Sequence, residues 1–129
     1  MNDDPRYHPE IVRRMRALPV AGEPPMLDAN CFGAAGSEAQ GASVELALRV
    51  VGGRISAAGF RAYGCPHVIA SCSWLAERLV GCSREEVAGW DWREVQQALA
   101  VPPQKFGRLL TIQDAAHDAA RNWPRSAVV

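Results

Sequence analysis

The chain has 129 residues, which is enough for one domain with a single packed core. Its hydrophobic (48%) and charged (22%) shares are those of an ordinary globular protein, and its 14 basic residues balance its 14 acidic ones, which argues against a nucleic-acid-binding surface. No apolar run approaches the roughly 18 residues of a membrane helix, and no secretory or organelle signal is recognised, so we expect a cytoplasmic protein that binds neither nucleic acid nor membrane.

The N-terminal region, residues 1–25, is predicted to hold one helix and a connector. Residues 8–18 place their apolar side chains at helical spacing: Ile11, Val12, Met15 and Leu18. Prolines then interrupt the helix, and a segment rich in Pro and Gly follows.

Residues 31–63 are predicted to form strands. After a short first strand over residues 31–35, apolar and polar side chains alternate as on a strand with one buried face. The glycine pair at 52–53 suits a tight hairpin turn. A return strand follows, and the shift of its apolar phase predicts a bulge at Gly59.

Residues 66–122 are predicted to be helical. Pro66 suits the first position of a helix, and an apolar stripe follows it: Val68, Cys72, Leu75 and Leu79. Capping-box patterns that begin at Ser83 and Asp91 predict two short helices. A last helix over residues 104–122 is expected to turn four side chains inward: Phe106, Leu109, Leu110 and Ala116. Strands followed by a run of helices predict an α+β fold, a three-stranded antiparallel sheet with helices on one face.

Cys65 is the candidate reactive residue. It stands between a strand and a helix, directly before Pro66, and is therefore expected at the N-cap position. Free backbone N–H groups and the helix dipole favour a thiolate there. The alternative is a small residue that only caps the helix and packs.

The other cysteines and the histidines are weaker candidates for a functional site. Cys72 lies on the apolar stripe and is expected to be buried, Cys82 follows a glycine and is expected to be exposed, and Cys31 is kept as an additional candidate ligand. His67 is close to Cys65 along the chain and could be a ligand or a proton carrier, although a surface position is expected. His117 is expected to be solvated.

The segment around Cys65 resembles a known family. Phe60-x-x-Tyr63-Gly64-Cys65, followed by a run of small residues as far as Ser73, is similar to the strand–cysteine–helix segment of NifU/IscU-type iron–sulfur scaffolds. The resemblance extends from about residue 31 to residue 121 and implies an IscU/SufE-like fold over a single domain, residues 1–129.

The resemblance also implies a site and a cargo. Family members gather three cysteines and an Asp or His at one end of the sheet, take sulfur from a cysteine desulfurase and hold iron or a transient [2Fe–2S] cluster, or bind zinc. Here Gln40 and Arg108 occupy the positions of the first and third cysteines, so only Cys65 carries over. We therefore expect no stably bound cofactor, and a thiolate on Cys65 that Arg108 would stabilise.

A second family segment binds a dedicated chaperone. It matches Val101, Pro102, Pro103 and Lys105, with Gln104 where the family has Val, so the chaperone stays an open question as a partner. The expected function is that of a degenerate scaffold, not an enzyme, that binds a cysteine desulfurase and accepts sulfur on Cys65. The alternatives are a non-catalytic interaction or regulatory module of iron–sulfur metabolism and a SufE-like sulfur acceptor.

Overall fold

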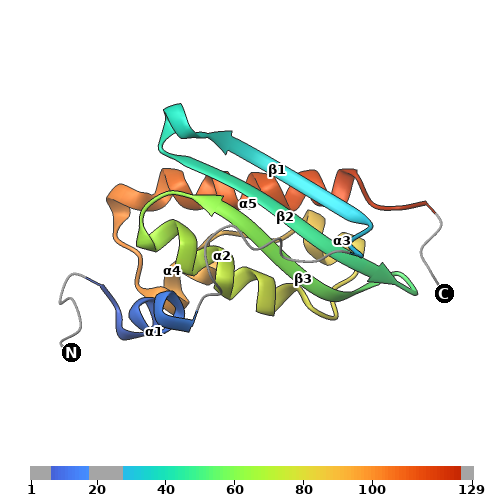
Figure 1. Cartoon of the computed structure of the whole chain (residues 1–129), viewed down its shortest axis with the longest axis horizontal. Helices are drawn as coiled ribbons and strands as arrows, with labels where there is room; N and C mark the ends of the chain where they lie inside the picture. Colours follow the sequence, from blue (N-terminus) through green and yellow to red (C-terminus); the bar gives the residue numbers. More distant parts are fainter. Residues whose placement is uncertain (1–6, 18–27, 126–129) are drawn as a thin grey trace.

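The fold is seen in a computed structural model, which describes residues 7–17 and 28–125 (Figure 1). Much of the predicted connector lies outside these residues. In chain order the elements are α1 (Pro9–Ala17), β1 (Cys31–Ser37), the 3-10 turn η1 (Glu38–Gln40), β2 (Ala42–Val51), β3 (Arg54–Tyr63), α2 (Pro66–Leu79), α3 (Arg84–Ala88), α4 (Arg93–Leu99), the 3-10 turn η2 (Pro103–Lys105) and α5 (Phe106–Arg121). None of the described helices is long and apolar enough to cross a membrane.

The strands form one antiparallel sheet in the order β1-β2-β3, so the predicted α+β class is confirmed. The bulge lies at Ser56, not at Gly59. Arg49 pairs with Ala57 and Val50 pairs with Ile55, which leaves Ser56 as the extra residue, and its hydroxyl donates a hydrogen bond to the Arg49 carbonyl at 3.2 Å. The predicted position was three residues too far along the chain. A glycine shows where the backbone can bend easily, but the pairing with β2 determines where the extra residue lies.

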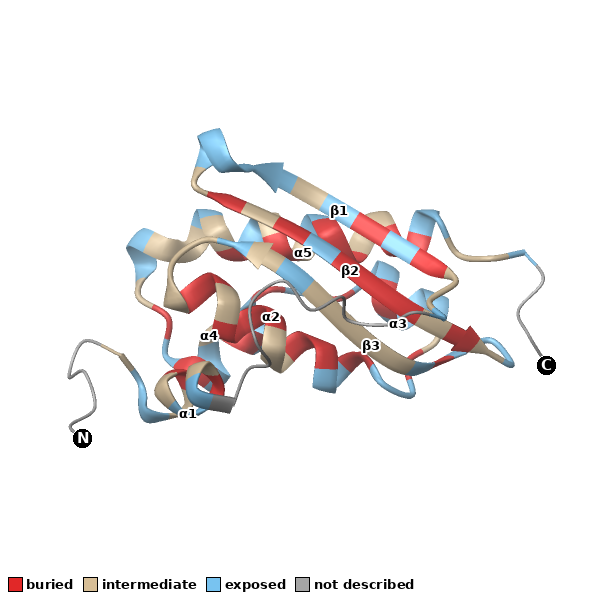
Figure 2. Ribbon diagram, in the orientation of Figure 1, coloured by how far each residue is buried: buried red, intermediate tan, exposed pale blue. Residues whose placement is uncertain are grey.

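The core lies between the sheet and the helices α2 and α5, and Figure 2 shows the buried residues along the facing sides. The predicted stripe of α2 is confirmed, since its four residues are at most 1% exposed. On α5, Leu109 is fully buried, but Leu110 is 44% exposed and the prediction for it was wrong. Neighbouring residues on a helix point about 100° apart, so only one of the two leucines can face the sheet.

Helix α5 packs directly on the backbone of β1. A Cβ built on Gly33 would lie 2.3 Å from the Ala115 carbonyl oxygen and 2.4 Å from the Ala119 nitrogen, closer than any side chain can fit. Glycine on the strand and alanines on the helix therefore allow this contact.

Helix α1 packs on α2 through an apolar contact and a partly buried ion pair. Ile11 is 1% exposed, and the Arg14 guanidinium, whose side chain is 9% exposed, pairs with Glu77 on α2 and with Glu10 at 2.8 Å. Nη1 of Arg14 also donates to the Ser73 hydroxyl at 3.2 Å, so this one nitrogen bonds to two residues of α2, whereas Nε is buried and has no hydrogen-bond partner among the described residues.

Candidate functional site

Cys65 lies where β3 passes into α2, at the left-hand end of the sheet in Figure 1. The predicted N-cap position is confirmed: Cys65 is extended (φ −73°, ψ 171°), and its carbonyl accepts the N–H groups of Val68 and Ile69. Its sulfur caps no helix N–H, and the side chain is half-buried against the core. The sulfur is thus held at the start of the helix with no hydrogen bond to the helix backbone.

The strand register brings the first family position to the same end of the sheet. Ser43 pairs with Tyr63, and two residues further along each strand stand Gly41 and Cys65. Gln40, the last residue of η1, is exposed beside Gly41. The η1 turn and the start of α2 therefore flank one region of the surface.

Arg108, in the first turns of α5, reaches this region as well. A Cβ on Gly41 would lie 2.7 Å from Nη2 and 3.0 Å from Cζ of Arg108, so the guanidinium rests against the Gly41 backbone. Gly41 has φ +88°, a conformation that glycine adopts readily. The family resemblance predicted that Arg108 lies at the site, but its contact with Gly41 could be found only in the folded chain.

His67 is not a surface residue, which corrects the prediction. It is 6% exposed, and the ring of Tyr7 lies against it with centroids 4.9 Å apart. Burial lowers the pKa of His67, and the positive charge of Lys105 lowers it further. Its Nδ1 atom is buried and has no hydrogen-bond partner within residues 7–17 and 28–125. A neutral imidazole is therefore favoured next to the start of α2.

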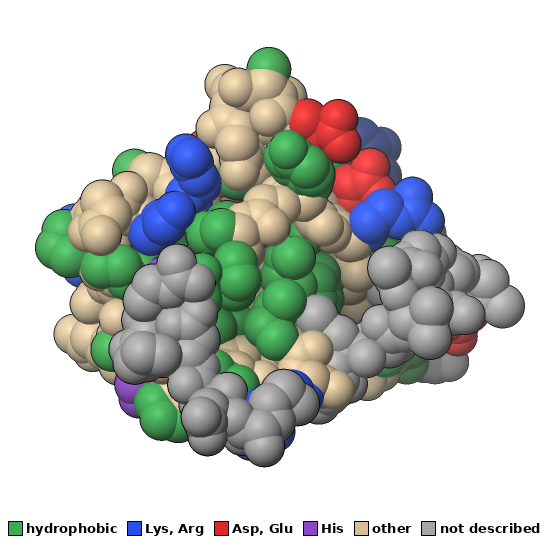
Figure 3. Space-filling model, turned by 60° about the vertical axis from the view of Figure 1, so that its left-hand side comes forward, with side chains coloured by type: hydrophobic (Ala, Val, Ile, Leu, Met, Phe, Trp, Pro, Cys, Tyr) green, Lys and Arg blue, Asp and Glu red, His purple; other side chains and the backbone are tan. Residues whose placement is uncertain are grey.

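Two cations at this end have no partner among the described residues. The side chains of Lys105 and Arg108 make no hydrogen bond or ion pair in the part of the chain that the structure describes. In the predicted chaperone segment, Val101 is buried, Pro102 and Lys105 are half-buried and Pro103 is exposed. Figure 3, which brings this end of the molecule forward, shows hydrophobic side chains gathered in a hollow with Lys and Arg side chains beside them.

The other three cysteines do not join Cys65. Cys31 pairs with Leu48, at the opposite end of the sheet, where burial raises its pKa to about 11. Cys72 is fully buried, as predicted, and burial raises its pKa strongly. Cys82 is 5% exposed, so its predicted exposure was wrong. Cys82 is buried because the turn after α2 pairs with Ile55 at the start of β3. Its sulfur also accepts a hydrogen bond from Arg78 at 3.4 Å.

The residues present do not fit the family's cargo. A [2Fe–2S] cluster needs about four protein ligands. Within residues 7–17 and 28–125, no group of three or more His, Cys, Asp or Glu side chains is arranged to hold a metal ion. The Arg108 guanidinium lies against Gly41, at the same end of the sheet as Cys65, and a positive charge in this region opposes binding of a cation.

Solved structures of iron–sulfur assembly proteins share this fold. A protein of Fervidobacterium islandicum AW-1, assigned as an iron–sulfur cluster assembly scaffold for the SUF system, matches with a TM-score of 0.67 at 16% identity, over 88% of this chain and 96% of its own. The N-terminal part of a NifU-like protein of Brucella abortus matches with a TM-score of 0.61 at 17% identity, over 88% and 91%.

Sequence relatives give the family. The chain is 35% identical over 124 residues to the bifunctional protein NifU/MnmA of Rubrobacter xylanophilus, covering 93% of this chain and 25% of that protein. It is 28% identical over 120 residues to the mitochondrial iron sulfur cluster assembly protein 2 of Saccharomyces cerevisiae, covering 91% and 77%. The chain thus spans about a quarter of the length of the first relative. The model of the NifU-like N terminal domain matches residues 6–128, and the chain belongs to this family of iron–sulfur cluster assembly scaffolds.

Proposed function

We propose that this member of the scaffold family accepts sulfur on Cys65 from a cysteine desulfurase and does not hold a [2Fe–2S] cluster within one chain. The observation that supports this most is the arrangement at one end of the sheet, where, among the described residues, one half-buried thiol shares the region with the Arg108 guanidinium, which has no partner there. A cation near a lone sulfur stabilises an anion there and disfavours a metal ion. Lys105, which pairs with none of the described residues, adds positive charge beside His67.

The proposed transfer exchanges one sulfur–sulfur bond for another. The Cys65 thiolate attacks the outer sulfur of a persulfide on the donor's cysteine. The bond between that sulfur and the donor's cysteine breaks, and the donor's cysteine leaves as a thiolate. The proton stays on the transferred sulfur or is lost to solvent, and no external oxidant or reductant is needed. The product on Cys65 is a persulfide, which is anionic when deprotonated and would be stabilised by Arg108.

Intact-mass measurement tests the proposal. The chain is incubated with a purified cysteine desulfurase and L-cysteine, and we expect the mass of one added sulfur atom, absent from Cys65→Ser. Arg108→Gln should slow the addition, whereas Arg93→Gln, at an exposed arginine on α4, should not. A wild-type chain that gains no sulfur would rule out the acceptor role. Desulfurase binding that persists in Cys65→Ser would then support the alternative, a non-catalytic interaction module.

Anaerobic incubation with iron and sulfide tests the second half of the proposal. We expect no cluster absorbance from a chain that stays monomeric by size-exclusion chromatography. A stable cluster on the monomer would contradict the proposal, and a cluster that appears only with a dimer would show ligands shared between two chains. The cytoplasmic location and the chaperone remain predictions from the sequence.

A further inference from the structure

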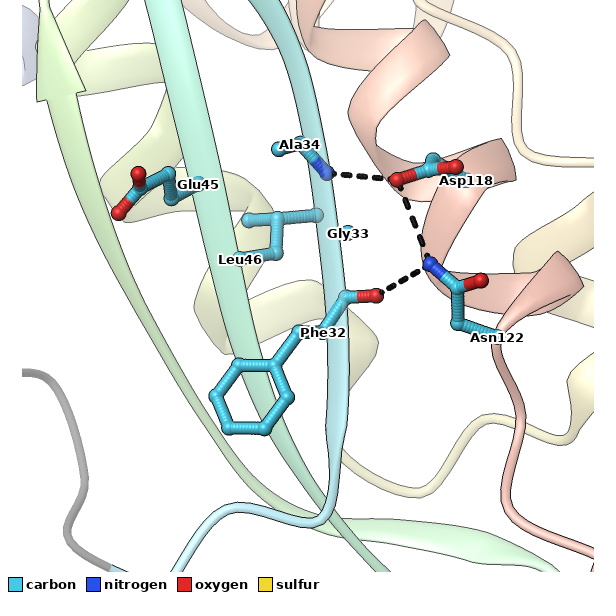
Figure 4. Close-up of a pocket in the computed structure, with 7 residues that line it drawn as sticks. All are labelled: Phe32, Gly33, Ala34, Glu45, Leu46, Asp118 and Asn122. Atoms are coloured by element: carbon cyan, nitrogen blue, oxygen red, sulfur yellow. Dashed lines mark hydrogen bonds between the residues drawn. The ribbon is translucent and has the colours of Figure 1, made fainter.

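The two edges of the sheet differ. On β1, the Ala34 N–H donates to the Asp118 carboxylate at 2.9 Å, and the Phe32 carbonyl accepts from the Asn122 amide at 2.9 Å (Figure 4). Both partners come from the C-terminal part of α5 and the residue after it. They occupy one N–H and one C=O that would otherwise be free to pair with another strand, so α5 blocks this edge at Phe32 and Ala34.

The register shows which residues of β3 face outward. Since Phe32 and Ala34 point their backbone groups away from β2, Gly33 and its partner Leu46 point toward each other. The neighbours of Leu46 on β2 therefore point toward β3, where Gly59 and Arg61 pair with them. By the same alternation, three residues of β3 turn their N–H and C=O groups to the outside: Ala58, Phe60 and Ala62.

At the start of β3 the Ile55 N–H and C=O pair with Cys82 and Gly81, but from Ala58 to Ala62 this second edge is open among the described residues. Among the described residues, none donates to or accepts from the outward backbone groups of Ala58, Phe60 and Ala62. Their side chains pack against the rim of the core and are only partly covered. Figure 2 shows most of β3 as intermediate or exposed, in contrast to the largely buried β2. An open edge with a half-covered apolar row is the arrangement that accepts an added strand.

We propose that the outer edge of β3 receives, as a fourth strand, an extended segment of the protein that donates sulfur to Cys65; the identity of this partner rests on the proposed function. The strand leads directly into the site, because Cys65 lies three residues after Ala62, roughly 10 Å at strand spacing. A segment paired along β3 would end beside the thiol. Its alternate residues would be small and apolar over Phe60, and an acidic residue would lie next to Arg61.

Arg61 supports the proposal that the added strand carries an acidic residue. It is 60% exposed, its one ion pair with a described residue is to Glu45 at 3.7 Å, and no other charged residue lies between the bulge and the end of β3. Cross-strand pairs of opposite charge favour one neighbour over another. An acidic residue on the new strand would therefore be selected on the side of Arg61 that faces away from Glu45.

Hydrogen exchange of the chain alone tests the open edge first. The amides of Ala58, Phe60 and Ala62 should exchange fast, while those of Gly59 and Arg61, which bond to β2, should be protected. Adding a purified cysteine desulfurase should then slow the three outward amides by at least about tenfold, the loss of exchange expected for one interfacial hydrogen bond. Unchanged exchange at all three amides on a bound desulfurase would overturn the docking site.

Ala62→Pro tests the link between docking and transfer. Its N–H points outward, so proline removes a donor from the edge without breaking the ladder to β2. We expect sulfur transfer from the desulfurase to fall about tenfold, while glutathione persulfide, a small donor, still modifies Cys65 at the wild-type rate. Ala34→Pro removes an outward N–H from the other edge, the one that bonds to Asp118, and this control should transfer normally once circular dichroism shows that it folds. Arg61→Glu should slow transfer as well, with Arg93→Glu as its control.

The other possible outcomes also test the proposed docking of the desulfurase on β3. Normal transfer in Ala62→Pro, in a variant that folds by circular dichroism, would overturn the proposal. If neither donor modifies the wild-type chain, the acceptor role of Cys65 fails, and the amide protection alone decides whether the edge docks the desulfurase. Protection of the same amides in the chain by itself, together with a doubled mass in solution, would assign the edge to a second copy and overturn the proposed partner.

Discussion

Replacement of Gly41 by alanine gives a quantitative test of how Arg108 is held. Gly41 has φ +88° and ψ 0°, and a residue with a Cβ in a left-handed conformation costs roughly 1–2 kcal/mol. The new Cβ would also stand 2.7 Å from Nη2 of Arg108. Because this is the end of a flexible side chain, its displacement should cost less than about 1 kcal/mol more. We therefore expect Gly41→Ala to lower the free energy of unfolding by about 1–3 kcal/mol.

A double-mutant cycle separates the two causes. Urea unfolding of the wild-type chain, Gly41→Ala, Arg108→Ala and the double variant should show a coupling of about 0.5 kcal/mol or more, as for residues in contact. Arg108 near Cys65 should also favour an anionic reagent, so both single variants should lower the rate of Cys65 alkylation by iodoacetate relative to neutral iodoacetamide. In the contrary case, Gly41→Ala lowers the free energy of unfolding equally with and without Arg108, and leaves the ratio of the iodoacetate and iodoacetamide rates unchanged. These two results together would refute the contact between the guanidinium and Gly41.

Further predictions concern His67, α1 and the thiols. Because the pKa of His67 is lowered in the folded chain, the unfolded chain takes up the proton first, so the free energy of unfolding should decrease as the pH falls below about 6.5. His67→Gln should flatten this dependence in urea unfolding between about pH 7 and pH 5, and an unchanged slope would contradict the burial argument. Arg14→Ala should cost about 1–2 kcal/mol because it breaks the partly buried contacts between α1 and α2. Arg13→Ala, on the exposed side of the same helix, should cost less than about 0.5 kcal/mol, and equal costs would show that Arg14 does not hold α1. Iodoacetamide should modify Cys65 alone in the native chain, since the other three cysteines are at most 5% exposed, and rapid double modification would refute the packing described for them.

The fold could be predicted from the sequence where local patterns agree with packing. The glycine pair at 52–53 and the alternation before it define the hairpin, and Pro66 with its apolar stripe defines α2. The Ser83 capping box is formed in full, with both reciprocal hydrogen bonds to Glu86. In these cases the sequence pattern and the interactions that form the element lie within the same short stretch of chain.

The site was harder to predict, because its residues acquire their surroundings from distant parts of the chain. His67 is buried by Tyr7, and His117, predicted to be solvated, is half-buried with its Nε2 atom 2.9 Å from the Trp90 carbonyl oxygen. Cys31 was a candidate ligand from the sequence, but the register of β1 places it at the far end of the sheet from Cys65. The position of Cys65 before Pro66 identified it locally and family resemblance added Arg108, whereas the asymmetry of the sheet edges could only be derived from strand pairing.

The close contact of α5 with β1 has a consequence for how the chain folds. It joins residues as far apart as Cys31 and Ala119, which are 88 positions apart. Contacts of such long sequence separation form late, because the chain must first lose the entropy of the loop between them. During synthesis β1, β2 and β3 leave the ribosome before α5, so β1 has to wait for the last helix before its edge is protected. Until then the nascent sheet has two unprotected edges, and this interval is when the chain is most exposed to aggregation or to capture by a folding factor.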